Sequence, residues 1–432
     1  MNLLLIILFA ALCVGLFYWG WREPEGTYQF PFLAGATFFA FVLPQVIGLR
    51  HDTDLPTGAL AKTLFMTFLC ALMCYAGYRW RNHPMRSFAW SFEQKRLLWV
   101  SGVLTGIGAW CFFQISRLPE EMTSASQWSG LTVAYLFFAQ ILAYGFAVAV
   151  ILYFRTGSRI ALALAIFGSL FYLDRIFIAG RRGIAAEFAF ILLLGVAFGR
   201  RKFVSRGAMV GVLITATLFL HSTGDYRSIT MDEDGPQWSR VSQIPFLDNF
   251  RDLLREGGGE MRNVVYMIEA TERLGNFDYG AFHWNTLVFN YVPAQILGDE
   301  FKQSLLIPLE NNAASVFGYE ASVGSTVTGM VDAFQSFWYF GCLKFFVLGF
   351  LLHRIYAAAA EGHFVAQLFY MLMLMPGLHC ITHHTSWFIS PWVHIGLFLI
   401  PGLVLARTPN QKLTRRNAFS PLLVQQAAGV PS

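Results

Sequence analysis

Charged residues are scarce in this chain of 432 residues, where Asp, Glu, Lys and Arg make up 13% and apolar residues 56%. So little charge excludes an ordinary soluble surface, and the mean hydropathy of +0.50 is typical of an integral membrane protein. The ten-residue alternation that marks a transmembrane β-strand is also missing. The composition therefore predicts an all-α polytopic membrane protein.

Sequence signatures for several kinds of chemistry are missing too. The chain has no Walker loop, no His-Glu-x-x-His, no Gly-x-Ser-x-Gly and no dinucleotide fingerprint. One Asp-x-Asp pair, Asp52 and Asp54, is of the type that holds a divalent ion beside a sugar diphosphate, but three-residue matches are common by chance. We predict neither a cofactor nor a metal. Basic clusters are short and flank apolar runs, so the net charge of +5 predicts no nucleic-acid partner.

The cysteines give no sign of a disulfide framework, because all six lie in or at the ends of apolar runs. They are Cys13, Cys70, Cys74, Cys111, Cys342 and Cys380. The N-terminal run lacks a basic n-region and a convincing cleavage site. We therefore expect a retained helix there rather than a signal peptide.

Eleven apolar runs are long enough to cross a bilayer, which takes about 20 residues each. They lie near 2–21, 30–48, 58–78, 97–115, 130–154, 160–178, 184–199, 207–221, 330–352, 364–380 and 386–406. With the C-terminus inside, the inner segments hold seventeen Lys and Arg residues, and the outer loops and span edges hold five. The positive-inside bias therefore predicts an outer N-terminus and an inner C-terminus.

One segment is neither a span nor a short loop. Residues 222–326 are polar, carry fifteen Asp and Glu against seven Lys and Arg, and fall outside. We expect short helices over 248–256 and 260–274, and an interfacial aromatic stretch over 284–293. Such a cap usually marks a substrate chamber. The expected organisation is a bundle of eight helices over 1–221, a cap over 222–326, three helices over 327–406 and a tail over 407–432.

Two adjacent arginines, Arg181 and Arg182, lie in a tight turn that this orientation places outside, against the charge bias. A guanidinium pair at a membrane surface suits a phosphate or diphosphate, which indicates a lipid-diphosphate substrate. Just before the turn come Asp174 and Arg175, inside an apolar run. Asp174 either pairs with a basic residue on a neighbouring helix or positions guanidiniums that hold the substrate.

Two further clusters carry candidate side chains. His221, Asp225 and Arg227 emerge together where the eighth run ends, and they fit an acceptor hydroxyl and a phosphate or an ordinary hydrated loop. The last outer turn holds three histidines at 379, 383 and 384. They are compatible with a metal, with a general base or hydroxyl-binding group, or with interfacial packing.

The stretch after the cap resembles a known family. Gly324-Ser-Thr-Val-Thr-Gly329, followed by Asp332 and Phe340-Gly341, is similar to an element of bacterial oligosaccharide repeat-unit polymerases of the Wzy type. Residues 277–293 resemble the family's Tyr-Gly…Pro stretch, although Ala294 stands where an Arg often follows. The Gly-Arg-Arg-Gly turn over 180–183 also matches the family's arginine after a mid-chain span.

The resemblance implies a helical fold of the C-type glycosyltransferases, in the bacterial inner membrane with a periplasmic N-terminus and a cytoplasmic C-terminus. Such an enzyme polymerises undecaprenyl-diphosphate-linked oligosaccharides into O-antigen or capsular polysaccharide on the periplasmic face. Its partners would be these lipids, the bilayer and a chain-length regulator. The predicted site residues are Arg181, Arg182, Asp225 and His383 as catalytic groups and Arg175, Arg227, Asp332 and Tyr279 as substrate-binding groups, with Asp225, Asp332, His221 and His383 all open as the base.

Two alternatives are open. An O-antigen ligase shares architecture and donor but transfers the glycan to lipid A-core, and it would use an outer-loop histidine with arginines. A transporter of lipid-linked oligosaccharides is the second alternative. The one-sided cap and the lack of internal repeats speak against it.

Overall fold

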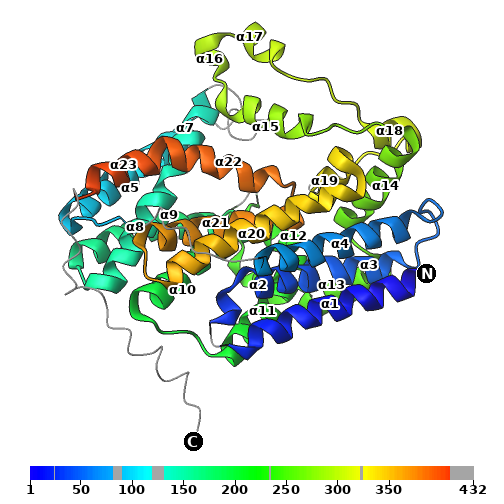
Figure 1. The fold of residues 1–432 in the computed structure, drawn as a ribbon, viewed down its shortest axis with the longest axis horizontal. Helices are drawn as coiled ribbons and strands as arrows, with labels where there is room; N and C mark the ends of the chain where they lie inside the picture. The colour runs from blue at the N-terminus through cyan, green and yellow to red at the C-terminus, as the bar shows by residue number, and fades with distance from the viewer. Residues whose placement is uncertain (24, 81–89, 119–130, 233–234, 322–324, 409–432) are drawn as a thin grey trace, which may run out of the picture.

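The computed structural model describes residues 1–23, 25–80, 90–118, 131–232, 235–321 and 325–408 (Figure 1). Within these ranges every regular element is a helix, apart from one isolated antiparallel bridge between Phe92 and Arg407. The prediction of an all-α polytopic membrane protein is confirmed. Gly324 of the family-like element and almost all of the predicted tail lie outside the described residues.

Ten helical stretches in these ranges are long and apolar enough to cross a membrane, and a bent pair brings the number to 11. They are Asn2–Arg22 (α1), Phe30–Leu49 (α2 to α3), Ala59–Arg79 (α4), Gln94–Ile115 (α5), Thr132–Thr156 (in α7 and α8), Arg159–Phe177 (α9), Arg182–Arg200 (α10), Gly329–Ala360 (α19 to α20), Phe364–Thr382 (α21) and Ser386–Ala406 (α22 to α23). The bent pair is Arg206–His221 (α11) with Thr223–Thr230 (α12), which meet at 67°. Each of the eleven predicted runs has its helix.

Local sequence explains where several of these helices begin and end. Ser158 caps α9, because its side chain accepts a hydrogen bond from the Ala161 backbone N–H. Gly157 closes α8 in the left-handed conformation at φ +69°, which a residue without a Cβ adopts freely. The long stretch from Gly329 to Ala360 is broken at Trp338, whose φ of +54° separates α19 from α20.

Close backbone contact joins α4 to α20, which lie side by side in Figure 1. A Cβ at Gly77 would collide with the carbonyl oxygen of Phe346, and a Cβ at Gly349 with that of Cys74. Small residues at such a crossing let two apolar helices approach until their backbones touch. All six cysteines are buried and unpaired, with Cys74 at this crossing.

The segment between α12 and α19 forms a cap over one end of the bundle, which we call the cap end. The cap contains α13 (Phe246–Glu256), α14 (Gly259–Leu274), α15 (Ala281–Tyr291), α16 (Ala294–Leu297), α17 (Asp299–Ser304) and α18 (Asn312–Phe317). The first two confirm the predicted cap helices over 248–256 and 260–274. In Figure 1, α15 to α17 reach furthest from the bundle.

Ion pairs fasten α14 to the bundle. Arg262 lies 2.8 Å from the Asp52 carboxylate, and Lys62 contacts both Glu269, at 2.8 Å, and Glu272. Burial alone would raise the pKa of Glu269, but hydrogen bonds from Lys62 and Arg273 outweigh it and lower that pKa. Asp52 of the Asp-x-Asp pair therefore has a guanidinium partner in the structure.

The α4–α20 crossing gives a first testable prediction. Gly77→Ala should destabilise the protein by roughly 1–3 kcal/mol, because the new methyl group forces the two backbones apart. Gly106→Ala is the matched control, since a Cβ there meets nothing within 4 Å and alanine favours the helix. Thermal unfolding in detergent measures both. Equal melting temperatures for the two variants would contradict the described crossing.

Candidate functional site

The predicted arginine turn lies at the cap end, between α9 and α10. Gly180 takes a left-handed φ of +56°, which reverses the chain between Phe177 and Arg182. The Arg181 backbone N–H donates to the carbonyl of Arg175 at 3.1 Å and closes the turn. The arginine pair therefore comes directly after a chain reversal that glycine permits.

Helix α12 packs against this turn. The Tyr226 hydroxyl donates to the Phe177 carbonyl at 2.8 Å, and Arg227 Nε donates to the Gly180 carbonyl at 3.4 Å. A Cβ at Gly180 would lie 3.0 Å from Arg227 Cγ and 3.1 Å from the Tyr226 ring. The bend between α11 and α12 thus brings Arg227 onto the arginine turn, although the two lie far apart in sequence.

The structure brings together all four arginines that the sequence singled out. Arg227 is within electrostatic range of Arg181 and Arg182, and Arg175 is within range of Arg181. Arg182 Nη1 donates to the Leu220 carbonyl at 3.1 Å, and Arg175 lies 5.4 Å from the centre of the Phe112 ring. None of the four forms an ion pair with a carboxylate among the described residues.

Two carboxylates within electrostatic range of the arginines were missed by the sequence analysis, whereas Asp174, which is also within range of Arg175, was not. Glu187, on α10, accepts a hydrogen bond from the Tyr172 hydroxyl at 3.0 Å and is within electrostatic range of Arg175. Glu260 of the cap is within range of Arg182. Asp174, the residue expected to position guanidiniums, is exposed and has no ion pair in the described part of the chain. A lone Glu in the apolar run after Arg182 was the available signal.

The predicted histidine turn between α21 and α22 lies beside the arginines. His379 faces Gly183, where a Cβ would lie 2.8 Å from the ring Nε2. Burial, followed by the neighbouring His379 and the Arg182 guanidinium, lowers the pKa of His383 to about 3. Burial likewise lowers the pKa of His384 to about 4. Both imidazoles are therefore neutral near pH 7 and available as hydrogen-bond acceptors or bases.

Among the described residues, the histidines of this turn are not joined by further ligands into a metal site. Across the described ranges, no group of three or more His, Cys, Asp or Glu side chains is arranged to hold a metal ion. The ring Nδ1 of His383 pairs with the Thr382 hydroxyl at 2.8 Å, and that of His384 pairs with the Ser386 hydroxyl. These contacts leave the hydroxyl-binding and packing interpretations of the turn.

The other candidates near the arginines have protein partners. Asp225, on α12, is exposed and accepts a hydrogen bond from Asn249 of the cap at 2.6 Å. His221 Nε2 lies 3.0 Å from the Ala40 carbonyl, so one ring nitrogen is used within the bundle. Asp225 consequently lies between α12 and α13, two residues from Arg227 in sequence but hydrogen-bonded to the cap.

Asp332 and Tyr279 lie in a second cluster rather than among the arginines. Asp332 is 2% exposed and accepts hydrogen bonds from the backbone and hydroxyl of Thr385. The Tyr279 side chain is 73% exposed, and its φ of +48° is strained for a residue with a Cβ. Its ring approaches Phe337 at 6.4 Å. Tyr279 is thus placed to touch a ligand, whereas Asp332 is enclosed by protein.

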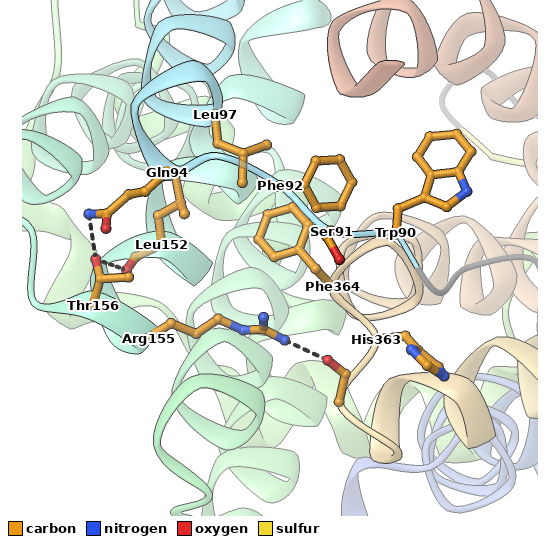
Figure 2. Close-up of a pocket in the computed structure, with 11 residues that line it drawn as sticks. Trp90, Ser91, Phe92, Gln94, Leu97, Leu152, Arg155, Thr156, His363 and Phe364 are labelled. Atoms are coloured by element: carbon orange, nitrogen blue, oxygen red, sulfur yellow. Dashed lines mark hydrogen bonds between the residues drawn. The ribbon is translucent and has the colours of Figure 1, made fainter. Parts of the chain in front are cut away.

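A cavity of about 390 Å³ lies at the other end of the bundle, where α5, α8 and α21 meet. Figure 2 shows that Arg155 points across it, toward the Gly362 carbonyl, to which it donates at 3.0 Å. Phe92 and Phe364 supply the apolar wall. Arg155 lies in the last turn of α8, just before α9 begins, and Arg175 lies in the last turn of α9, so most of the length of α9 separates the cavity from Arg175. The two sites are separate.

The tight turn gives a second prediction. Gly180→Ala should cost about 1–2 kcal/mol in folding stability, because alanine disfavours the left-handed conformation, and its methyl group presses on Arg227. Gly224→Ala on α12 is the matched control, since a Cβ there meets open space. Melting temperatures in detergent distinguish the two. A Gly180→Ala protein as stable as Gly224→Ala would mean that the turn is not built as described.

Three largely buried histidines predict how stability changes with pH. Burial, with lesser contributions from nearby positive charges for His283 and His383, lowers the pKa of His283, His383 and His384 to about 3, 3 and 4. Unfolded histidine titrates near 6.5, so below that pH the unfolded state binds more protons than the folded state. The melting temperature should therefore fall as pH drops from about 7 toward 4. His384→Gln should weaken this dependence, and a slope unchanged by that substitution would contradict the buried neutral imidazole.

No family model, curated protein or solved structure matches this chain. The site must therefore be interpreted from its own chemistry. It is a group of four arginines without a carboxylate ion-pair partner among the described residues, beside neutral histidines, at the cap end of an all-α polytopic membrane protein.

Proposed function

We propose that the protein is a membrane glycosyltransferase that joins lipid-diphosphate-linked oligosaccharide repeat units into a polysaccharide. The observation that carries this proposal is the group formed by Arg175, Arg181, Arg182 and Arg227, which has no ion-pair partner among the described residues. Like charges held together at the edge of a low-dielectric bundle repel each other, and a bound anion relieves that repulsion. Guanidiniums match the oxygens of a diphosphate.

The chemistry requires little beyond charge stabilisation and positioning. A glycan linked to a lipid diphosphate already carries an activated leaving group, so no nucleotide has to be supplied. The enzyme has to stabilise the negative charge that develops on the diphosphate and to orient the incoming hydroxyl. Arginines at the cap end supply the first function, and the neutral histidines of the α21–α22 turn are close enough to assist the second.

The cap supports a substrate larger than a lipid headgroup. Its helices cover the same end of the bundle as the arginines, and Tyr279 presents an exposed ring there. Aromatic faces of this kind pack against apolar faces of ligands. In the proposed orientation the cap end is periplasmic in a bacterial inner membrane, the N-terminus is periplasmic and the C-terminus is cytoplasmic. The positive-inside bias of the short loops favours that orientation.

An O-antigen ligase is the second candidate, and the histidine turn beside the arginines favours it. Gene deletion separates the two activities. Loss of a polymerase leaves single repeat units on the final acceptor, whereas loss of a ligase leaves bare lipid A-core and polymer that is still lipid-linked. Loss of a transporter would leave the repeat units on the cytoplasmic face.

The arginines give the prediction that tests the proposed function. Arg181→Ala and Arg182→Ala should each lower the rate of polymer formation by roughly 10²–10³, as for the loss of one contact to a developing anion. Purified protein with lipid-linked repeat units, analysed by polymer length on gels, provides the measurement. Arg50→Ala is the control, because Arg50 is exposed at the cap end and pairs only with His51 among the described residues.

Two results would overturn the proposal. Wild-type protein that makes no polymer from any lipid-linked repeat unit, and transfers none to lipid A-core, would exclude a glycosyltransferase of this kind. Full polymer yield from both arginine variants would leave the activity standing but remove the assigned diphosphate site.

A further inference from the structure

A chain of hydrogen bonds connects the cap to the bundle beside the arginine site. His283 on α15 pairs through its ring Nε2 with the Thr385 hydroxyl, at 2.8 Å. The same hydroxyl lies 3.0 and 3.1 Å from the two oxygens of Asp332, on α19. Three elements that are distant in sequence therefore contribute one residue each: α15 of the cap, the residue before α22, and α19.

The number of protons available along these hydrogen bonds determines the tautomer of the His283 imidazole. A threonine hydroxyl carries a single proton, and an ionised carboxylate only accepts, so the Thr385 proton goes to Asp332. His283 Nε2 must then carry a hydrogen and donate it to the Thr385 oxygen. In a neutral imidazole the other nitrogen, Nδ1, consequently has a free lone pair.

The free nitrogen of His283 is accessible. Nδ1 has no hydrogen-bond partner among the described residues, and it is not one of the fully buried polar atoms left unpaired there. The side chain is 13% exposed, so a small part of the ring reaches the surface. This geometry suits a general base. The Thr385 hydroxyl, backed by the Asp332 carboxylate, fixes Nε2, while Nδ1 is accessible.

Charged and titratable groups surround the hydrogen-bonded residues Asp332, Thr385 and His283 on several sides. Lys344 Nζ lies 3.6 Å from Asp332 Oδ1 and donates to the Ser336 hydroxyl at 2.8 Å. Asp278 is within electrostatic range of Asp332 and Lys344, and His384 is within range of His283. Burial, then the Lys344 ammonium and the neighbouring His384, lowers the pKa of His283 to about 3, so its ring is neutral near pH 7.

The other histidines nearby lack this arrangement. His383 Nδ1 pairs with Thr382, and His384 Nδ1 pairs with Ser386. No carboxylate continues either contact among the described residues. His384 is nevertheless within electrostatic range of both His283 and His383, and His383 is within range of Arg182. The α21–α22 turn therefore connects the arginines to the Asp332–Thr385–His283 chain.

We propose that His283 is the catalytic base that activates the acceptor hydroxyl, with Thr385 and Asp332 as positioning residues. This inference rests on the proposed glycosyltransferase function. The acceptor hydroxyl oxygen attacks the anomeric carbon of the donor sugar, and its proton passes to His283 Nδ1. The bond from that carbon to the diphosphate breaks, its electron pair leaves on the diphosphate, and a glycosidic bond forms. His283 then releases the proton to solvent.

The tautomer of His283 tests the hydrogen-bond chain without any substrate. Histidine ¹⁵N NMR of the full-length protein in detergent, with the signal assigned by its loss in His283→Gln, should show hydrogen on Nε2 and none on Nδ1. Thr385→Val removes the hydroxyl and should change the tautomer ratio, while Thr385→Ser keeps the hydroxyl and should match wild type. Hydrogen on Nδ1 in the wild-type protein would overturn the proposal.

Transfer kinetics test the catalytic role. His283→Gln should lower kcat by roughly 10²–10⁴ with little change in KM for the lipid-linked donor, since the arginines that hold the diphosphate are intact. Thr385→Val should lower kcat less and Thr385→Ser should restore it. A His283→Gln enzyme with wild-type kcat would refute the base. Wild-type protein with the expected tautomer but no transfer activity would instead refute the proposed function. It would then also refute the role of His283 in deprotonating an acceptor hydroxyl.

Discussion

The placement of four positive charges at one edge of an apolar bundle, without a carboxylate ion pair in the described part of the chain, is the constraint on which the candidate site depends. Charge in such a setting is costly, and proteins usually neutralise it. Here the guanidiniums are held instead by backbone carbonyls, as in the contacts of Arg182 with Leu220 and of Arg227 with Gly180. Carbonyl contacts fix the direction of a guanidinium but leave its charge in place. An arrangement that keeps the charge exposed to an incoming anion is better suited to binding than to stability.

The cap, in contrast to the arginine group, is attached to the bundle by ion pairs between basic residues and carboxylates. Arg262 with Asp52, and Lys62 with Glu269, join α14 to the bundle by carboxylate contacts at 2.8 Å. The same end of the molecule thus contains two kinds of basic residue: those that form ion pairs between the cap and the bundle, and those that form no ion pair among the described residues. The difference marks the arginine group as functional more clearly than its position in a loop does. Lys344 belongs to the paired kind, since it lies 3.6 Å from the buried Asp332 carboxylate.

Much of the fold was predictable from the sequence, because a helix that crosses a bilayer must be apolar over its whole length. The eleven runs and the helices α13 and α14 follow from local composition and spacing. The gathering of Arg227 onto the turn at Gly180 was only partly predictable, since the 67° bend that allows it depends on Tyr226 reaching the Phe177 carbonyl. The contact between His283 and Thr385 was not predictable at all. It joins residues 102 positions apart through packing that no local pattern encodes.

The two clusters at the cap end have complementary chemistry, and this division is what a two-substrate transfer requires. Stabilising a leaving diphosphate calls for permanent positive charge, which arginine supplies at every physiological pH. Accepting a proton from a hydroxyl calls for a neutral nitrogen, which a protonated imidazole cannot offer. A base placed directly among four guanidiniums would be kept neutral, but its protonated form would be strongly disfavoured when the proton arrives. The α21–α22 turn separates His283 from the arginines, and the charged or titratable groups within electrostatic range of its ring are Lys344 and His384. The Asp332 carboxylate, reached through Thr385, lies on the side of His283 where an imidazolium would need it.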